Sequence, residues 1–296
     1  MKIYDCFMFY DEDLIVDLRL NILNQYVNEF IIVESRFTHS GKKRKLLFDT
    51  NKYSNFKNKI NYIVLENEPS NLEKVNETDS YDKKNSKYIM NALKRENYQR
   101  NAITRGLSEA NPDDLVLISD ADEIPNLTNL DVEKISNEII LFKQNFYYYK
   151  FNLQLKDIPW LGTKACKYKL LKSPQWLRNV KDKKYPFWRL DVLFSNKKYS
   201  NLKFIEDGGW HFSNMKTAAD IEKKMRTYLH HREYDVNPLG KEKIEEIIKN
   251  KKSIYNLKAD MKTEKFDGTQ SLTPTDGSEL PEFIKENIKK YSNWIE

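Results

Sequence analysis

The first 33 residues constrain the fold most, because they alternate between two secondary-structure patterns. Residues 3–9 form an apolar run that predicts a buried strand, and residues 30–33 predict a second one. Between them, residues 13–27 carry apolar side chains at helical spacing, which predicts an amphipathic helix. A strand, a helix and a strand this close together form a βαβ unit, whose crossover connection is right-handed.

The remainder of the first half extends this alternation. Residues 60–65 predict a third strand, and the polar residues 68–86 predict a surface loop. Residues 88–109 predict a long helix, which is followed at once by a buried strand over residues 115–118. This order predicts an α/β fold with a mixed, mostly parallel central sheet flanked by helices.

The second half is richer in aromatic residues and less regular. Strands are predicted at 139–155, 166–171, 187–194 and 202–206, and helices at 217–231, 240–255 and 281–291. We interpret residues 1–235 as one domain, in which residues 1–130 hold a nucleotide-type ligand and residues 131–235 complete the site. Residues 236–296 are expected to form a helical extension packed on this domain.

The charge balance argues against a nucleic-acid-binding protein. The 296 residues carry 50 basic and 44 acidic side chains, mixed along the chain, so the net charge is only +6. The sequence contains neither a signal-peptide pattern nor a run of roughly 18 apolar residues that could cross a bilayer. Cys6 and Cys166 each lie among apolar residues, which predicts buried thiols in a reducing compartment. We therefore expect a cytosolic protein with, at most, peripheral membrane contact.

Residues 115–125, LVLISDADEIP, place three carboxylates at the end of a buried strand. Ligands of open α/β sheets bind beyond the carboxyl ends of the strands. Two aspartates one residue apart, Asp120 and Asp122, can reach one hard cation there, and Mg²⁺ or Mn²⁺ often shares its shell with phosphates. An acidic turn in which Glu123 begins a new element is the alternative. The position after a buried strand favours the metal site.

Residues 206–213 are a second candidate for chemistry. Two adjacent glycines beside an aromatic residue allow the backbone to approach a ligand closely. His211 is a candidate metal ligand or phosphate donor, and Asp207 or Glu206 is a candidate general base for a hydroxyl group. The alternative is a glycine hairpin that carries a half-buried Trp210.

Two further groups of polar residues follow predicted strands or precede the acidic motif. Arg100 lies one helical turn after Glu96, which is usually a surface ion pair, but the planar guanidinium also binds diphosphates well. The loop after the second strand suits contacts to a base or a ribose, unless it is an ordinary exposed turn; its candidates are Glu34, Thr38, Ser40 and Gly41.

Three blocks in this sequence together resemble glycosyltransferase family 17. They are FYDEDLIVDLRLNILNQYVNEFIIVESRFTHSGKKRKL, LVLISDADEIP and GGWHFS, and they span residues 3–231 in the family's order. The family includes the enzyme that adds bisecting N-acetylglucosamine to N-glycans. The resemblance implies a GT-A-like fold, a UDP-sugar donor, a divalent cation (Mn²⁺ or Mg²⁺) and inversion at the anomeric carbon.

The resemblance also implies roles for individual residues. Asp120 and Asp122 match the metal-binding motif, and the block after the second strand matches the expected uridine contacts. His211 and Trp210 match the block near the donor sugar or the metal, and Arg100 precedes the metal motif. Asp207 is the first choice for the base that deprotonates the acceptor, and Glu206 is the second.

The acceptor is expected to be a glycan, a polysaccharide or a glycoprotein. Vertebrate members of the family carry a membrane anchor that this sequence lacks, so a bacterial surface polysaccharide or a viral glycan is expected instead of a Golgi N-glycan. The corresponding location is the bacterial cytosol or, for a virus, the host cytosol or the virion. Two other functions are compatible with the residues: a metal-dependent phosphohydrolase or nucleotidyltransferase, and a non-catalytic carbohydrate-binding protein.

Overall fold

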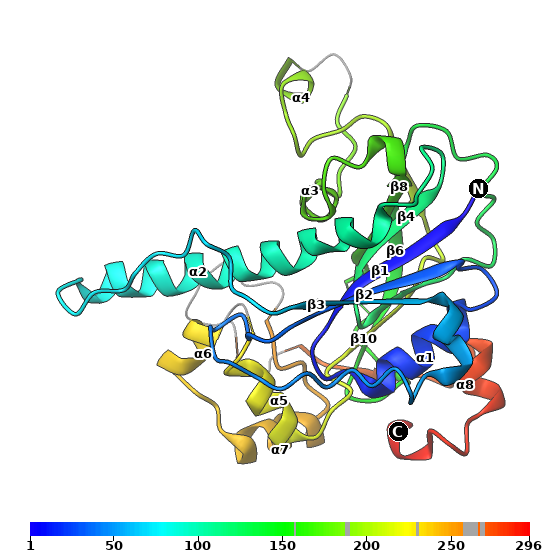
Figure 1. Ribbon diagram of the computed structural model, residues 1–296. Coiled ribbons are helices and arrows are strands. Elements are labelled where there is room, and N and C mark those ends of the chain that lie inside the picture. The colour runs from blue at the N-terminus through cyan, green and yellow to red at the C-terminus, as the bar shows by residue number, and fades with distance from the viewer. Residues whose placement is uncertain (157, 187–189, 229–230, 257–265, 267–269) are drawn as a thin grey trace.

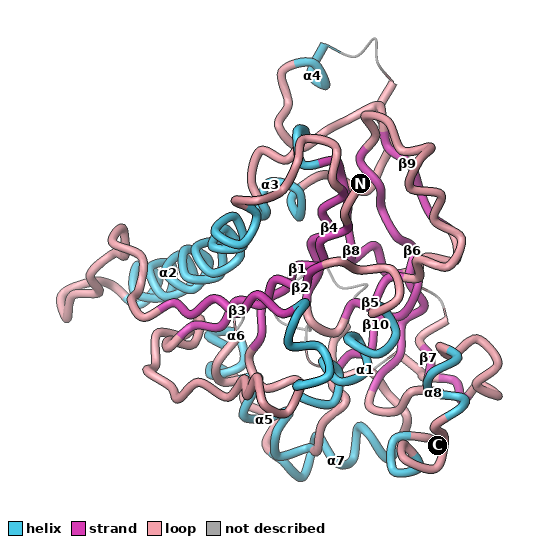
Figure 2. The backbone as a smooth tube through the Cα atoms, turned by 45° about the vertical axis from the view of Figure 1, so that its right-hand side comes forward, coloured by secondary structure: helices cyan, strands magenta, loops and turns pink. Residues whose placement is uncertain are grey.

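The computed structural model describes residues 1–296 except 157, 187–189, 229–230, 257–265 and 267–269. A mixed sheet runs through the molecule (Figure 1), and its strands lie in the order β11-β7-β6-β8-β4-β1-β2-β3. Its parallel part, which lies side by side in Figure 2, consists of β3 (Ile60–Leu65), β2 (Glu29–Ser35), β1 (Ile3–Phe9) and β4 (Leu115–Asp120). This confirms the predicted mixed α/β fold with a mostly parallel core.

The helices of the first half connect these parallel strands. Helix α1 (Asp13–Leu23) joins β1 to β2, as the βαβ pattern predicts. Helix α2 (Tyr81–Asn101) and a 3₁₀ segment (Ala102–Leu107) join β3 to β4. The loop predicted over residues 68–86 is wrong in its last part, because α2 already begins at residue 81. The Ser80 side chain accepts a hydrogen bond from the backbone N of Lys83 and caps the helix there.

The second half adds antiparallel and short strands to the sheet. Strand β8 (Trp160–Lys167) is antiparallel to both β4 and β6 (Ile139–Tyr148). Strands β9 (Leu202–Ile205) and β10 (Gly209–Ser213) run parallel to β6. The shorter strands are β5 (Glu123–Pro125), which pairs with β10, and the pair β7 (Leu153–Gln154) and β11 (Thr273–Pro274).

Two strand predictions in this half need correction. The strand predicted at 166–171 ends at Lys167, because the backbone N of Tyr168 donates to Asp114 O and turns the chain into a 3₁₀ segment (Tyr168–Leu170). Of the strand predicted at 187–194, residues 187–189 lie outside the described residues, and α4 (Leu190–Leu193) is helical.

The last part of the chain contains short helices separated by loops. They are α5 (Ala218–Met225), α6 (His231–Val236), α7 (Lys241–Lys249) and α8 (Glu282–Glu286). The C-terminal segment contacts the sheet, since Phe151 N donates to Trp294 O at 2.7 Å and Glu296 N donates to Asn152 Oδ1 at 2.7 Å. Helix α8 packs against α1 (Figure 1). Within the described residues, this region is less helical than the sequence pattern suggested.

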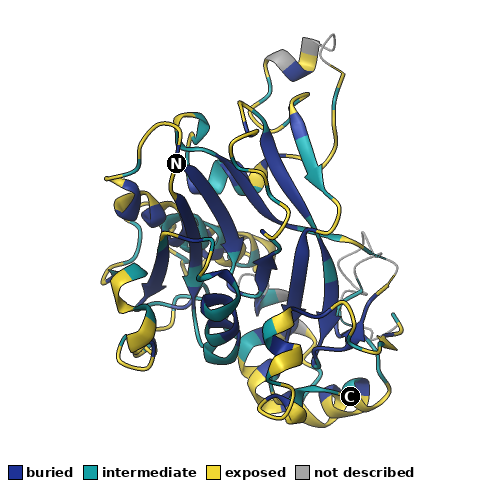
Figure 3. Cartoon of the chain, turned by 90° about the vertical axis from the view of Figure 1, so that its right-hand side faces the viewer, coloured by how far each residue is buried: buried dark blue, intermediate teal, exposed yellow. Residues whose placement is uncertain are grey.

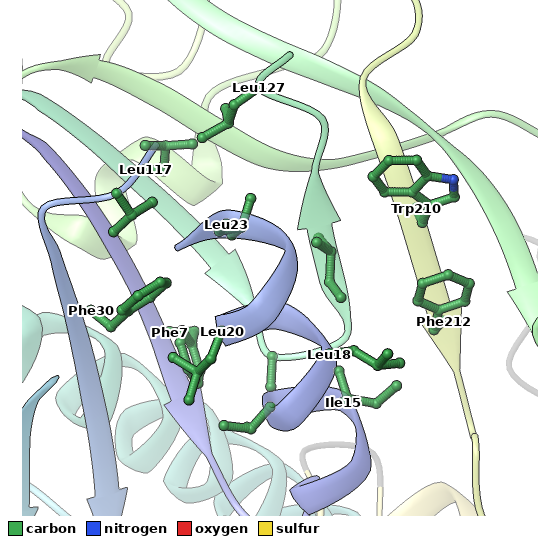
Figure 4. Close-up of a cluster of buried hydrophobic side chains, with 14 of the residues drawn as sticks. Phe7, Ile15, Leu18, Leu20, Leu23, Phe30, Leu117, Leu127, Trp210 and Phe212 are labelled. Carbon is green, nitrogen blue, oxygen red and sulfur yellow. The ribbon is translucent and has the colours of Figure 1, made fainter. Parts of the chain in front are cut away.

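The core lies on both faces of the parallel strands, of which β1, β2 and β4 are buried along most of their length and β3 is only partly buried (Figure 3). Side chains on one face, such as Phe7 and Phe30, pack against Leu20 of α1 (Figure 4). On the other face, Cys6 and Cys166 are buried and free, as predicted. In the described part of the chain, no helix combines the length and the apolar character needed to span a bilayer.

A short helix, α3 (Pro174–Asn179), lies beside α2 and β8 and completes the scaffold of the site. Ser173 caps its N-terminus by accepting a hydrogen bond from Trp176 N at 3.1 Å, and Pro174 occupies the first turn, where no backbone donor is needed. The capped start of α3 sets the direction from which Arg178 extends.

Candidate active site

A cavity of about 410 Å³ lies at the carboxyl ends of β1, β2 and β4. Residues from these three strand ends line it, including Tyr10, Thr38 and Asp122. Helix α2, β10 and the end of α5 contribute Arg100, His211 and Lys224. The cavity therefore occupies the place at which ligands bind in open α/β sheets.

The backbone of the acidic turn after β4 is held by a buried arginine. Arg19 of α1 donates from Nη1 to the carbonyl oxygens of Asp120 (3.2 Å), Ala121 (3.2 Å) and Glu123 (2.7 Å). The guanidinium is itself bound by Asp5 of β1, and the side chains of both residues are 0% exposed. The position of the acidic turn is therefore fixed from beneath by a buried ion pair.

Glu123 is fully buried and pairs with Arg178. Its Oε2 accepts from Arg178 Nη1 at 2.7 Å and from the backbone N of Asp120 at 2.8 Å. Its Oε1 accepts from Trp160 Nε1 at 2.7 Å and from Arg178 Nη2 at 3.0 Å. Both oxygens are thus satisfied by protein donors, and Glu123 supports the site without facing the ligand.

Asp120 lies between two arginines. Its Oδ1 accepts from Arg100 Nη2 at 3.0 Å, and its Oδ2 accepts from Arg178 Nη2 at 2.9 Å. Burial raises the pKa of Asp120, but the two guanidinium groups outweigh burial and hold the pKa well below its usual range. Arg100 also binds Glu96 at 2.8 Å, so the predicted helix pair exists and extends to the acidic motif.

Asp122 faces a histidine and a lysine. Its Oδ1 lies 3.5 Å from His211 Nε2, which is longer than a normal hydrogen bond, and its Oδ2 lies 3.9 Å from Lys224 Nζ. Burial raises the pKa of Asp122, whereas His211 and then Lys224 lower it, and the net shift is downward. The His211 ring packs against both Phe146 and Trp160, with centroids at 4.3 and 4.6 Å, and these two rings are 5.1 Å from each other.

The donor set partly fits a divalent cation. Within the described ranges, no group of three or more histidine, cysteine and acidic side chains is arranged to hold a metal ion. Asp122 and His211 would supply two protein ligands, and substrate oxygens and water would complete the shell. Asp120 lines the same cavity and its side chain is 38% exposed, but each of its oxygens already accepts from a guanidinium.

The loop after β2 contributes to the cavity through only some of its predicted residues. Thr38 lines the cavity, and its hydroxyl lies 2.9 Å from that of Ser40. Gly41, with φ of 91°, closes the turn, and a Cβ there would lie 2.7 Å from Arg95 Nη2. His39, which the sequence prediction did not single out, also lines the cavity, and burial lowers its pKa.

Glu34 acts through an arginine and does not line the cavity. Its carboxylate accepts from the backbone N of Leu47 (2.8 Å), from the Tyr62 hydroxyl (2.7 Å) and from Arg44 Nη2 (2.9 Å). Arg44 does line the cavity and lies over the Tyr10 ring, 4.3 Å from its centroid. Glu34 thus positions the cation that faces the ligand space.

Trp210 and the two candidate bases lie outside the cavity. Trp210 and His211 are adjacent in β10, so their side chains point to opposite faces. Trp210 faces the apolar cluster around α1 (Figure 4), and its Nε1 donates to Glu279 O at 2.6 Å. Glu206 is 75% exposed and pairs with Lys143, and Asp207 accepts from the Asn126 side chain at 3.0 Å. The structure does not bring either carboxylate to Asp122.

Glu12 is a carboxylate at the cavity that sequence reasoning missed. It follows β1, and its Oε2 accepts from the backbone N of Tyr10 (2.8 Å) and of Asp11 (3.1 Å). Burial raises its pKa, and Asp11 adds to this effect, while Lys216 and Lys224 oppose it; the net shift is upward. The carboxyl-end rule that singled out Asp120 applies equally to the end of β1 and would have found this residue.

The fold is that of an α/β protein with a cavity at the carboxyl ends of its parallel strands, the place at which α/β enzymes bind their ligands. The family model described as Glycosyltransferase family 17 matches residues 1–295. The chain therefore belongs to glycosyltransferase family 17, and its activity is that of a glycosyltransferase, which confirms the predicted family. A comparison with curated proteins found no match.

Proposed function

We propose that this enzyme transfers a hexosamine or hexose, with N-acetylglucosamine as the first candidate, from a UDP-sugar to a hydroxyl group of a glycan or polysaccharide. In this proposal the fold is of the GT-A type and the anomeric carbon is inverted. The observation that carries the proposal is the convergence of Asp122, His211 and Lys224 at the carboxyl end of β4, inside a cavity of about 410 Å³. A cavity of this size is within the usual range for small-molecule sites.

The distribution of charge supports an orientation for the donor. Lys224 and Arg44 are cations on the cavity wall, with side chains that are 20% and 10% exposed. Phosphate oxygens bind such cations well in a partly dry site. We place the diphosphate between Lys224 and Asp122 and the nucleoside toward Thr38 and His39, at the end of β2.

Asp122 and His211 would hold the divalent cation, Mn²⁺ or Mg²⁺. When bound, such an ion neutralises the charge that develops on the departing diphosphate. Asp120 has a different role in this proposal. Its lowered pKa keeps it ionised, and it orients Arg100 and Arg178 around the acidic turn.

We propose Glu12 as the general base that accepts the proton of the acceptor hydroxyl. It lies on the cavity wall, and its raised pKa brings it closer to neutral pH, where a base accepts a proton most effectively. The earlier candidates, Asp207 and Glu206, hydrogen-bond to Asn126 and Lys143 outside the cavity. We therefore do not retain them as the base.

Transfer assays with a panel of UDP-sugars and glycan acceptors test this function. We expect release of UDP together with a new glycoside in the presence of Mn²⁺, and loss of both in EDTA. Full activity in EDTA would show that transfer does not require a metal ion and would contradict that part of the proposal. Release of UMP or phosphate without a glycoside would indicate a phosphohydrolase, and sugar binding without any turnover would indicate a binding protein.

A further inference from the structure

A second cavity, of about 340 Å³, adjoins the first one. Glu12, Asp122 and Lys224 line both cavities, so the two spaces meet at these side chains. The second cavity extends toward the start of α1 and the chain after β10, where Leu14 and Met215 line it. The proposed base and the proposed metal ligand thus lie at the boundary between two ligand-sized spaces.

Carboxylates are the most numerous polar side chains among the residues that line the second cavity. Glu12 and Asp122 are joined there by three further acidic residues, Asp11, Asp13 and Asp220. Two lysines, Lys216 and Lys224, also line the cavity. Lys216 forms an ion pair with Asp11. Carboxylates accept hydrogen bonds from hydroxyl groups and repel anions. The lining therefore suits an uncharged polyhydroxyl ligand better than an acidic one.

Asn214 is an independent indication that a ligand binds in this cavity. The residue is 2% exposed and lines the cavity, and its backbone adopts the left-handed region with φ of 54°. Its Oδ1 accepts from Lys224 Nζ at 3.3 Å, and its Nδ2 has no hydrogen-bond partner among the described residues. A buried donor without an acceptor is unfavourable, and a ligand oxygen would satisfy it once the amide turned toward the cavity, since Nδ2 itself is closed to solvent.

Trp294 supplies an aromatic wall from the C-terminal segment. Its side chain lines the cavity and is only partly buried. Its backbone is held at both ends, because its N donates to Tyr291 O at 2.8 Å and its O accepts from Phe151 N at 2.7 Å. An indole face beside carboxylates and an amide matches a sugar, which presents an apolar ring face and polar edges.

We propose that the second cavity is the acceptor site and that it binds an uncharged sugar residue of the acceptor. This inference rests on the proposed function, which places the donor in the first cavity. The acceptor hydroxyl then reaches Glu12 at the boundary. Its oxygen bonds to the anomeric carbon, the bond from that carbon to the diphosphate breaks with its electron pair leaving on the diphosphate, and the hydroxyl proton passes to the Glu12 carboxylate.

Ligand-observed NMR on the full chain tests the proposal without relying on turnover. The probes are the methyl glycosides of glucose and N-acetylglucosamine, methyl glucuronide as an anionic analogue, and UDP for the donor cavity. We expect the neutral glycosides to bind and the glucuronide to bind at least about tenfold more weakly. Trp294→Ala is expected to weaken neutral glycoside binding about tenfold or more, and Trp294→Phe to retain most of it.

Asn214→Gly provides a second variant, because glycine tolerates the positive φ and only the amide is lost. We expect several-fold weaker glycoside binding, whereas Asn250→Gly, at an exposed helix end, is expected to behave like the wild type. UDP binding should be unchanged in Trp294→Ala, Trp294→Phe and Asn250→Gly, which also verifies their folding. For Asn214→Gly, whose amide accepts from Lys224 Nζ, circular dichroism verifies folding instead.

Three results would overturn the acceptor site: no glycoside binding to the wild type, equal glycoside binding by the wild type, Trp294→Ala and Asn214→Gly, or preferred binding of the glucuronide. Failure of UDP to bind the wild type would contradict the proposed function instead, and the glycoside results would still report on the second cavity.

Discussion

Arg178 and Glu123 form an ion pair beneath the acidic turn, with Nη1 and Oε2 2.7 Å apart and the Glu123 side chain fully buried. The same guanidinium reaches Asp120, which also binds Arg100. Asp122, the third carboxylate of the turn, faces a histidine and a lysine instead. The three acidic groups are therefore stable together because positive side chains face each of them, and among the three only Asp122 has no guanidinium partner in the described residues.

Replacing Arg178 by methionine should destabilise the protein strongly. Removal of one partner from a buried ion pair leaves an uncompensated charge and costs about 3–5 kcal/mol. Urea unfolding of the wild type and of Arg178→Met measures the effect. Arg105→Met, which alters an exposed arginine, is the control and should change stability by less than about 0.5 kcal/mol. Equal midpoints for the two variants would contradict the role of the pair.

Asp122→Ala should weaken Mn²⁺ binding in the presence of UDP by about tenfold or more, because it removes the carboxylate that faces His211. Calorimetric titration of Mn²⁺ measures this change. Glu206→Ala removes an exposed carboxylate of the other candidate block and should bind Mn²⁺ as the wild type does. If Asp122→Ala retained the wild-type affinity, the metal would have to bind elsewhere.

Glu12→Gln should lower kcat by about 10²–10⁴-fold with little change in the KM for the donor, because the variant retains the shape of the base but cannot accept the proton. Asp207→Asn and Glu206→Gln are the controls, and both should transfer sugar at close to the wild-type rate. Steady-state kinetics with both substrates varied distinguishes these cases. If Asp207→Asn or Glu206→Gln lost activity and Glu12→Gln kept it, the base would be assigned to residue 207 or 206 instead.

The pH profile gives a second measurement on Glu12. A base acts when it is ionised, so kcat/KM should rise with pH as the Glu12 carboxyl loses its proton. Because burial raises the pKa of Glu12, this rise should lie above the ordinary glutamate value of about 4.3. The rise should disappear from the residual activity of Glu12→Gln. If kcat/KM of Glu12→Gln still rose with pH as it does in the wild type, the rise would belong to another group.

Stability should also depend on pH through Asp120. Its folded-state pKa lies below the unfolded value, so the ionised form stabilises the native state above about pH 4, and this contribution is lost as the pH falls toward the folded pKa. The thermal midpoint of the wild type should exceed that of Asp120→Asn at pH 7, and the difference should shrink below about pH 4. A difference that is constant between pH 7 and pH 3 would argue against a charge effect.

Gly209→Ala should destabilise the strand that carries His211. Gly209 has φ of 115°, and a Cβ at this position would lie 2.2 Å from Ile124 O. Gly240 also has a positive φ, but a Cβ there would meet only Glu242 Oε2, at 3.7 Å. Gly240→Ala should therefore cost only the backbone strain of about 1–2 kcal/mol, and Gly209→Ala should cost more. Thermal unfolding of both variants measures the two losses of stability. Equal losses would show that the close approach of Ile124 O to position 209 adds nothing.

The sequence by itself determined the parallel core and one edge of the site. Apolar runs and helical spacing identified β1, α1, β2 and the strand that ends at Asp120, because these patterns reflect local burial. The rule that ligands bind at the carboxyl ends of parallel strands then singled out Asp122 and Thr38, both of which line the cavity. Two predictions were wrong: a loop over residues 81–86 and a strand over residues 190–193, both of which are helical. Polar composition and short apolar runs do not distinguish helix, strand and loop.

Only the tertiary structure decided which side chains meet. Arg178 is 55 positions from Glu123, and no periodic pattern connects them. The pairing of β10 with β5 and β6 turns His211 toward the cavity and Trp210 toward the core, so neighbours in the sequence separate into different environments. Sheet order and register are long-range properties that depend on the packing of the whole chain. The charge partners of the acidic turn follow from that packing, and so does the place of Glu12, the proposed base, at the cavity.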